Sequence, residues 1–131
     1  MVTIKGSTIG GTGTNEANEA TGTGSDGNGG GIYVGEFCTL RLQDSTDSGV
    51  RIIGNQAANG GGVYAKNILN LSMQGGTQIA VNNDVYLDSN SKITVVNTLT
   101  AEAPVARITP ENYSEFPPVK VLDGSAVGSE Y

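Results

Sequence analysis

The sequence of 131 residues contains no histidine, no tryptophan and a single cysteine. Without histidine, the chain cannot build a Ser–His or Cys–His catalytic pair. The one cysteine, Cys38, cannot form a disulfide within the chain. Because an unpaired cysteine usually packs as a small apolar side chain, we expect Cys38 to be buried rather than to act as a reactive thiol.

Positive charge and long apolar runs are also scarce. The chain has 7 lysines and arginines against 13 aspartates and glutamates, a net charge of −6. Nucleic acids and anionic membrane surfaces require a basic face on their partner, so this balance argues against both. The sequence has no apolar run of about 18 residues, so we expect no segment that spans a membrane as a helix.

Glycine, by contrast, is abundant, and it marks a repeat. The stretch from Asn28 to Tyr33 reads NGGGIY and the stretch from Asn59 to Tyr64 reads NGGGVY, so the two copies start 31 residues apart. A third copy, from Asn83 to Tyr86, keeps the Val-Tyr pair but replaces the glycines with acid and amide residues. Each copy is followed by β-branched or aromatic residues, which favour a short strand entered through a turn. Similarity at a repeated position is typical of a repeat architecture.

The spacing of strands and turns predicts the architecture. Each repeat contains three short alternating segments separated by turns, and takes about 22 residues where the turns are tight. This pattern predicts an all-β fold, a right-handed parallel β-helix (β-solenoid) of about three coils with a C-terminal cap. Equivalent side chains should then stack, and Tyr33, Tyr64 and Tyr86 should form an aromatic ladder. The apolar positions expected to face the interior are Ile32, Leu40, Leu42, Ile52, Val63, Leu69, Leu71, Ile79, Val85 and Ile93.

Composition divides the chain further. We expect residues 1–124 to form one β-helix domain, followed by a tail at 125–131. Residues 10–31 are polar and rich in glycine, which predicts a long surface loop with a helical turn near its middle. Residues 101–124 are expected to cap the last coil, with Tyr113 and Phe116 as apolar anchors. At the corner where the loops shorten along the chain, we expect an internal ladder of amides from Asn55, Asn59 and Asn82.

The repeats resemble a known group of sequences. The segments GGGIYV and GGGVYA, the intervening IGNQA at 53–57 and the run MQGGTQI at 73–79 are similar to repeats of bacterial polymorphic outer-membrane proteins. They also look like right-handed β-helix repeats in large bacterial surface proteins. The resemblance covers roughly residues 32–124. It implies a secreted or surface-displayed protein, extracellular or at the cell surface, that serves as an adhesin or passenger domain.

Two chemical alternatives remain open at the polar turns. A glycoside hydrolase on this fold would need two carboxyl groups across a groove, and the available carboxylates are Asp44, Asp47, Asp84 and Asp88. All four lie in turns rich in Ser, Asn and Gly, where aspartate commonly bonds to the backbone, so we expect no catalytic residue and no enzyme.

Calcium is the second alternative. Residues 22–26 read GTGSD, half of a calcium-binding repeat motif, and Glu19, Asp26 and Asn28 lie near it. Such sites take ligands from tandem copies, and this motif occurs once, so we expect no cofactor and no metal site, with calcium left as the alternative. The candidate binding residues are therefore Asp26, Asn28, Asp44 and Asp47.

These observations predict a structural or adhesive repeat module of a larger secreted or cell-surface bacterial protein. Its partner would be a glycan or protein of a host or cell surface. The alternative is a carbohydrate-binding or polysaccharide-cleaving β-helix. The first strands, within residues 2–9, would leave an unpaired edge, so we also expect end-to-end self-association.

Overall fold

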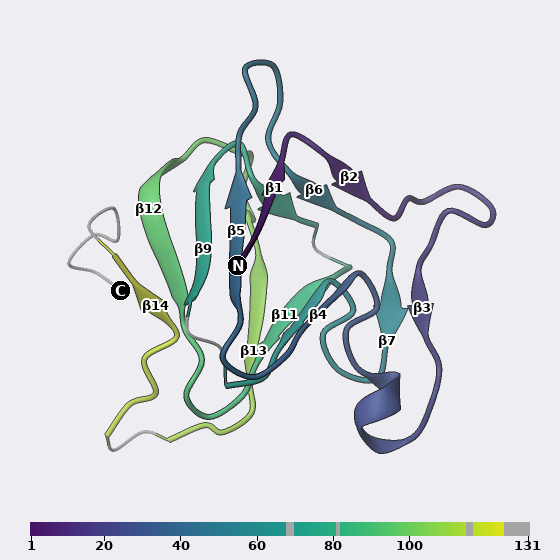
Figure 1. Ribbon diagram of the computed structural model, residues 1–131, viewed down its shortest axis with the longest axis vertical. Helices are drawn as coiled ribbons and strands as arrows, with labels where there is room; N and C mark the ends of the chain where they lie inside the picture. The colour runs from purple at the N-terminus through teal and green to yellow at the C-terminus, as the bar shows by residue number, and fades with distance from the viewer. Residues whose placement is uncertain (68–69, 81, 115–116, 125–131) are drawn as a thin grey trace.

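The protein is all-β, as the sequence predicts (Figure 1). The computed structural model describes residues 1–67, 70–80, 82–114 and 117–124. Within these ranges it contains 14 strands and one 3-10 helix, η1 (Gly24–Gly27). Every strand pair in these ranges is parallel, so no hairpin joins neighbouring strands.

The largest sheet has five strands. In spatial order they are β1 (Val2–Lys5), β5 (Thr39–Gln43), β9 (Asn70–Gly75), β12 (Ile93–Leu99) and β14 (Leu122–Asp123). Sequence order and spatial order agree, so each later visit of the chain adds one strand to the same edge. Val2 aligns with Leu40, Leu40 with Leu71, and Ile93 with both Leu71 and Leu122. Equivalent apolar residues therefore form one continuous column.

The other sheets follow the same rule. The four-stranded sheet contains β4 (Ile32–Val34), β8 (Val63–Ala65), β11 (Asp84–Leu87) and β13 (Arg107–Pro110). The three-stranded sheet contains β2 (Thr8–Ile9), β6 (Arg51–Ile52) and β10 (Gln78–Ile79). The pair β3 (Glu19–Ala20) and β7 (Gln56–Ala57) forms the last. From β1 to β4, and again from β5 to β8, the chain visits the four sheets in the same order.

The core lies between these sheets and follows the predicted alternation. Eight of the ten predicted core residues are buried: Leu40, Leu42, Ile52, Val63, Leu71, Ile79, Val85 and Ile93. Ile32 is only partly buried because its strand β4 is the edge strand of its sheet, although it packs against the core. Leu69 lies outside the described residues. Arg41 and Arg51, at alternate positions of β5 and β6, are exposed.

The predicted tyrosine ladder is present. The ring centroids of Tyr33 and Tyr64 lie 5.4 Å apart, and those of Tyr64 and Tyr86 lie 5.1 Å apart. The planes differ by only 9° and 7°, so the rings are stacked. Val63 and Ala65 on either side of Tyr64 are buried, which places the ladder on the outward face of the β4–β8–β11–β13 sheet.

The long loop at 10–31 is more ordered than its composition suggests, and the prediction of a helical turn near its middle is wrong. Asn15 has φ of 64°, in the left-handed region that an α-helix does not allow. The loop instead contains strand β3, which pairs with β7, and then η1. Figure 1 shows both on the side of the molecule that β7 borders.

The expectation of a buried Cys38 is also wrong, because Cys38 is exposed. It lies in the turn between β4 and β5, where Phe37 has φ of 59° and is 66% exposed. The Cys38 N–H donates to the carbonyl of Gly35 at 3.3 Å, which closes this turn. A side chain in so tight a turn points away from the sheet and cannot reach the core.

Residues 101–124 supply the last strand of two sheets, β13 and β14. The predicted anchor Tyr113 does not bury its ring, since it is 78% exposed. The strand β13 ends at Pro110, and Tyr113 follows on the irregular segment beyond it, outside the alternation that turns side chains inward. The second predicted anchor, Phe116, and the tail at 125–131 lie outside the described residues.

Candidate functional site

Asp44 holds two turns together. Its Oδ1 and Oδ2 accept hydrogen bonds from the Gly76 N–H at 2.8 and 3.0 Å. Gly75 has φ of 58°, a conformation that favours glycine, and a Cβ on it would lie 1.7 Å from Asp44 Oδ2, so a larger residue would displace this carboxylate. Both Asp44 oxygens are therefore used within the fold.

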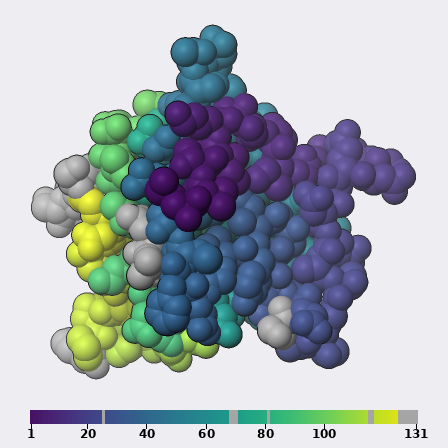
Figure 2. All heavy atoms as spheres, viewed as in Figure 1, coloured from purple at the N-terminus to yellow at the C-terminus, as the bar shows by residue number. Residues whose placement is uncertain are grey.

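Asp47 lies in the loop between β5 and β6, which projects from the top of the molecule in Figures 1 and 2. It is exposed, and its Oδ2 accepts from Thr46 Oγ1 at 3.2 Å. Ser45 Oγ accepts from the Asp47 N–H at 3.4 Å and the Ser48 N–H at 3.2 Å, which braces the loop tip. Asp47 is thus exposed to solvent, whereas Asp44, three residues before it, is partly buried and bonded to the Gly76 N–H.

Asp26 and Asn28 lie at another corner, where Asp26 is part of η1 and Asn28 directly follows it. Asp26 is exposed, whereas Asn28 Oδ1 accepts from Asn59 Nδ2 at 2.9 Å across an isolated parallel bridge between the two residues. Figure 1 places η1 far from the β5–β6 loop, so the structure does not bring the four candidate binding residues together. Within the described ranges, no three His, Cys, Asp or Glu side chains are grouped so that they could hold a metal ion.

Asp84 and Asp88, the other two carboxylates considered for a hydrolase, also bond to the backbone, as the sequence predicts for turn aspartates. Asp84 Oδ1 accepts from the Gly61 N–H at 2.8 Å, and Asp88 Oδ2 accepts from the Asn67 N–H at 2.7 Å. Asp88 Oδ1 also accepts from Ser91 Oγ at 3.0 Å. Each carboxylate joins one visit of the chain to the next.

An amide ladder exists at the predicted corner, but with different members. Asn83 Oδ1 accepts from both the backbone N–H and Nδ2 of Asn55 at 3.2 Å, and Asn83 Nδ2 donates to the Asn55 carbonyl at 2.8 Å. Asn55 Oδ1 in turn accepts from the N–H of Asn18 at 3.1 Å and from its Nδ2 at 2.9 Å. The prediction of Asn82 in this ladder is wrong, because its neighbour Asn83 is the buried one. Asn59 pairs with Asn28 instead.

The outward face of the β4–β8–β11–β13 sheet carries a row of tyrosines flanked by charged side chains. Thr109 aligns with Tyr86 and continues the tyrosine ladder by one position. Alongside the ladder run a Lys66–Glu36 ion pair, with 3.2 Å between Nζ and Oε1, and the carboxylates of Asp88 and Glu111. Sequence reasoning missed this flanking row, although the spacing gives a partial signal. Lys66 and Asp88 lie two positions after Tyr64 and Tyr86, and residues two apart on a strand share one face.

The environment favours the neutral phenol of two ladder residues, Tyr64 and Tyr86. Burial raises the pKa of Tyr64 above its ordinary value of 10.0, and the neighbouring Tyr86 and Tyr33 raise it further. Burial also raises the pKa of Tyr86, and the negative charges of Glu111 and Asp88 raise it further. Because stacked rings cover one another's faces, the row offers ring edges and hydroxyl groups to a partner, not flat aromatic faces.

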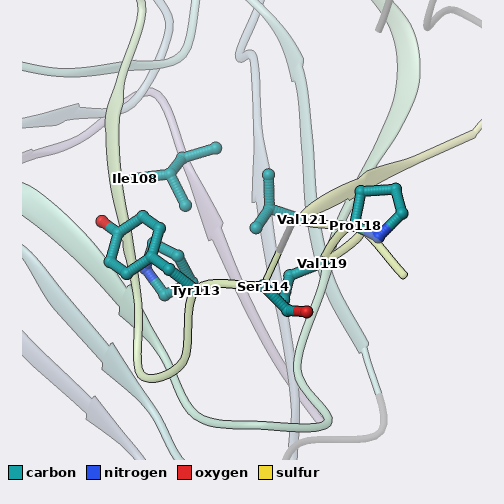
Figure 3. A pocket seen from close by; sticks show the side chains of 7 residues that line it. Ile108, Tyr113, Ser114, Pro118, Val119 and Val121 are labelled. Atoms are coloured by element: carbon teal, nitrogen blue, oxygen red, sulfur yellow. The ribbon is translucent and has the colours of Figure 1, made fainter. Parts of the chain in front are cut away.

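Two apolar hollows lie at the C-terminal end. One, of about 630 Å³, is lined by Ile108, Tyr113, Pro118 and Val121 among others, and Figure 3 shows the Tyr113 ring beside Ile108 with Pro118 and Val119 across the hollow. The other, of about 490 Å³, lies between β12 and the segment after it, and Ile108 lines both. Sequence reasoning placed a cap here and did not predict either hollow.

Comparison with protein-family models, with characterised proteins and with solved structures gave no match. The resemblance to bacterial surface-protein repeats therefore stays a prediction. In the part of the chain that the structure describes, no helix is long and apolar enough to cross a membrane.

Proposed function

We propose that this chain is a right-handed parallel β-helix that serves as a structural or adhesive module of a larger secreted or cell-surface bacterial protein. One observation carries the proposal: successive visits of the chain to its sheets stack in parallel register, with 31 residues from Leu40 to Leu71 and 22 from Leu71 to Ile93. Stacking of this kind builds a long rigid surface from short repeats, which suits display or adhesion better than an enclosed active site.

The use of carboxylates supports a non-enzymatic role. Asp44, Asp84 and Asp88 are all bonded to backbone N–H groups. A glycosidase needs one carboxyl held protonated and a second free to attack or to activate water. The backbone bonds of these three carboxylates hold turns in place, which supports a structural use.

The outward tyrosine row favours carbohydrate binding as the second candidate. A row of phenol hydroxyls beside Glu36, Lys66 and Glu111 offers both donors and acceptors to a polyhydroxylated ligand. It would bind a surface glycan without cleaving it, which agrees with an adhesive role.

A glycan array and a panel of host surface proteins, probed with the labelled chain, test the proposal. We expect saturable binding and no new reducing ends when the chain is incubated with polysaccharides. Release of reducing ends would overturn the non-enzymatic role. If glycans bind at the tyrosine row, Tyr33→Ala should weaken binding. The same substitution at an exposed tyrosine outside the row, Tyr113→Ala, should not. A crystal structure tests the handedness of the coil.

A further inference from the structure

The two ends of the core are apolar and only partly covered. Among the partly buried residues that pack against the core, Ile4, Ile9 and Ile32 come from β1, β2 and β4. At the other end, Ile108 and Leu122 come from β13 and β14. These five side chains at the two ends are half-covered, whereas the core residues aligned with them in the middle strands are buried.

The same strands are sheet edges. β1 and β14 are the outer strands of the five-stranded sheet, and β4 and β13 are those of the four-stranded sheet. An edge strand offers its outer N–H and C=O groups to another chain, and an added strand combines those bonds with side-chain pockets for specificity. In Figure 2 the N-terminal residues, in purple and blue, cover the face toward the viewer, so β1 and β4 lie on one common face.

One column lacks its last side chain. Ile4 aligns with Leu42, Leu42 with Met73, and Met73 with Val95. The next position is Gly124, since Asp123 aligns with Thr94. Gly124 lies against Val95, because a Cβ on it would fall 2.2 Å from the Val95 carbonyl oxygen. The column thus ends without a side chain, and the hollow of about 490 Å³ lined by Met73, Val95 and Leu122 opens there.

We propose that this end receives the N-terminal strand of a second copy of the chain, so that copies join head to tail. In the parallel register of the sheet, Val2 of the incoming copy lies over Leu122 and Thr3 over Asp123. Ile4 then lies over Gly124 and enters the hollow. The incoming Lys5 projects on the same side as Thr3, toward Asp123, whose Oδ1 is already paired with Lys120 Nζ at 3.1 Å, so the contact rests on strand pairing and apolar burial and not on charge.

The same displacement does not join the second sheet. The first sheet has five strands and the second has four, so a copy whose β1 lies on β14 leaves one strand position empty between β13 and its own β4. The contact therefore consists of the β14–β1 strand pair and the hollow beside it. A head-to-tail contact uses two different surfaces, so it leads to rings or open filaments and not to a closed two-fold dimer.

The rival arrangement is a two-fold contact between two N-terminal ends. It would pair β1 with β1 in antiparallel fashion and leave the C-terminal hollow empty. In the head-to-tail arrangement a change at either end prevents association, whereas in the two-fold arrangement only a change at the N-terminal end does. Variants at the two ends therefore distinguish the arrangements. The inference goes beyond the proposed function, and a failed glycan screen would leave it unaffected.

The experiment measures molar mass by light scattering at concentrations up to the millimolar range. Ile4→Lys blocks the donor end and Leu99→Glu, in the lining of the hollow, blocks the acceptor end. We expect the mass of the unmodified chain to rise with concentration and each variant alone to stay monomeric. An equimolar mixture should give a twofold mass and nothing larger, because one working donor and one working acceptor remain.

Further variants control for the added charge and for loss of folding. Thr46→Lys adds the same charge on the β5–β6 loop, away from both ends, and should associate like the unmodified chain. Val2→Lys at a residue that is 58% exposed, and Ala106→Glu, repeat the two blocks if circular dichroism shows that the first variants are unfolded. A strictly monomeric unmodified chain, or an acceptor variant that still associates by itself, would overturn the proposal.

Cysteine cross-linking tests the register. In a Cys38→Ser background, Thr3→Cys combined with Asp123→Cys should form disulfides between copies, since in-register neighbours on adjacent strands lie within the reach of about 4.4–6.8 Å that a disulfide spans between Cα atoms. Thr3→Cys combined with Lys120→Cys, three residues out of register, should not. Equal cross-linking of both pairs would contradict the proposed register.

Discussion

At the scale of single residues, burial separates side chains that look alike in the sequence. Asn82 and Asn83 are adjacent asparagines in the same turn, yet only Asn83 is buried, with 1% of its surface exposed. Its amide bonds to three groups of Asn55. A buried polar group is stable only when its hydrogen bonds are satisfied, so this pair holds two turns in register.

The core column through Leu71 gives the first prediction. Leu71 is fully buried between Leu40 and Ile93, so Leu71→Ala should leave a cavity and lower the free energy of unfolding by about 2–5 kcal/mol. Urea denaturation measures the change. Arg41→Ala, at an exposed position of the neighbouring strand, should change it by less than about 0.5 kcal/mol. A loss from Leu71→Ala as small as that of Arg41→Ala would show that the register is wrong.

The asparagine pair gives the second. Asn83→Ala removes the acceptor of two Asn55 donors and leaves them buried without that partner, which should cost about 1–3 kcal/mol. Asn82→Ala, at the exposed neighbour, should be close to neutral. Thermal unfolding of the two variants side by side measures both effects. Similar losses in both would refute the assignment of the ladder to Asn83.

At the scale of elements, the strands are ordered by their register, and the loops are ordered by side-chain hydrogen bonds to the backbone. The tyrosine row belongs to three strands, β4, β8 and β11, whose register stacks the rings at 5.4 and 5.1 Å. The loops between strands are held by carboxylate and hydroxyl bonds to the backbone, as at Asp44 and Ser45. The strands thus repeat while the loops differ, and the loops determine which polar side chains reach solvent.

The tyrosine row predicts a loss of stability in alkali. The pKa values of Tyr64 and Tyr86 are raised above the ordinary value of 10.0 by burial and by nearby negative charge. The unfolded chain therefore loses these protons first as pH rises, and the folded state loses its advantage through the pH range above 10. The melting temperature should fall there, and fall less in a Tyr64→Phe, Tyr86→Phe variant. An identical fall in both proteins would contradict this linkage.

The loop at 10–31 gives a prediction about metal. Asp26 is exposed on η1, and Asn28 Oδ1 already bonds to Asn59, so we expect calcium to bind weakly or not at all. Adding millimolar calcium should leave the melting temperature equal to that of an EDTA-treated sample. A rise that grows with calcium concentration, and that Asp26→Asn abolishes, would instead establish a site.

At the scale of the whole molecule, stability should decrease from the middle to both ends. The strands β5, β9, β8 and β11 have partners on both sides, whereas β1 and β14 are edge strands with partly buried core residues. Amide hydrogen exchange should therefore be slowest in the middle strands and fastest in β1 and β14. Uniform protection from β1 to β14 in a monomeric sample would contradict this gradient. Concentration-dependent protection of β1 would instead indicate the head-to-tail contact.

Alternation of apolar residues by itself determined which side chains of this protein face the core. Val63 and Ala65 turn inward and Tyr64 outward because side chains of a strand alternate, and this rule requires no knowledge of the partner strands. The recurrence of Ile-Tyr or Val-Tyr also determined that the three rings share one position in three aligned strands. Both features are local and periodic, so they can be predicted from the sequence.

Only the tertiary structure decided which residues are buried in the turns and on the edge strands, outside the periodic positions. Cys38 is exposed because the turn at Phe37 points it away, and Asn83 rather than Asn82 is buried because the turn geometry aims one amide at Asn55. Ile32 is only half-covered because its strand lies at a sheet edge. Turn direction and position in the stack depend on the neighbouring strands, which are about 20 to 40 residues away along the chain and leave no periodic signal at the residue itself.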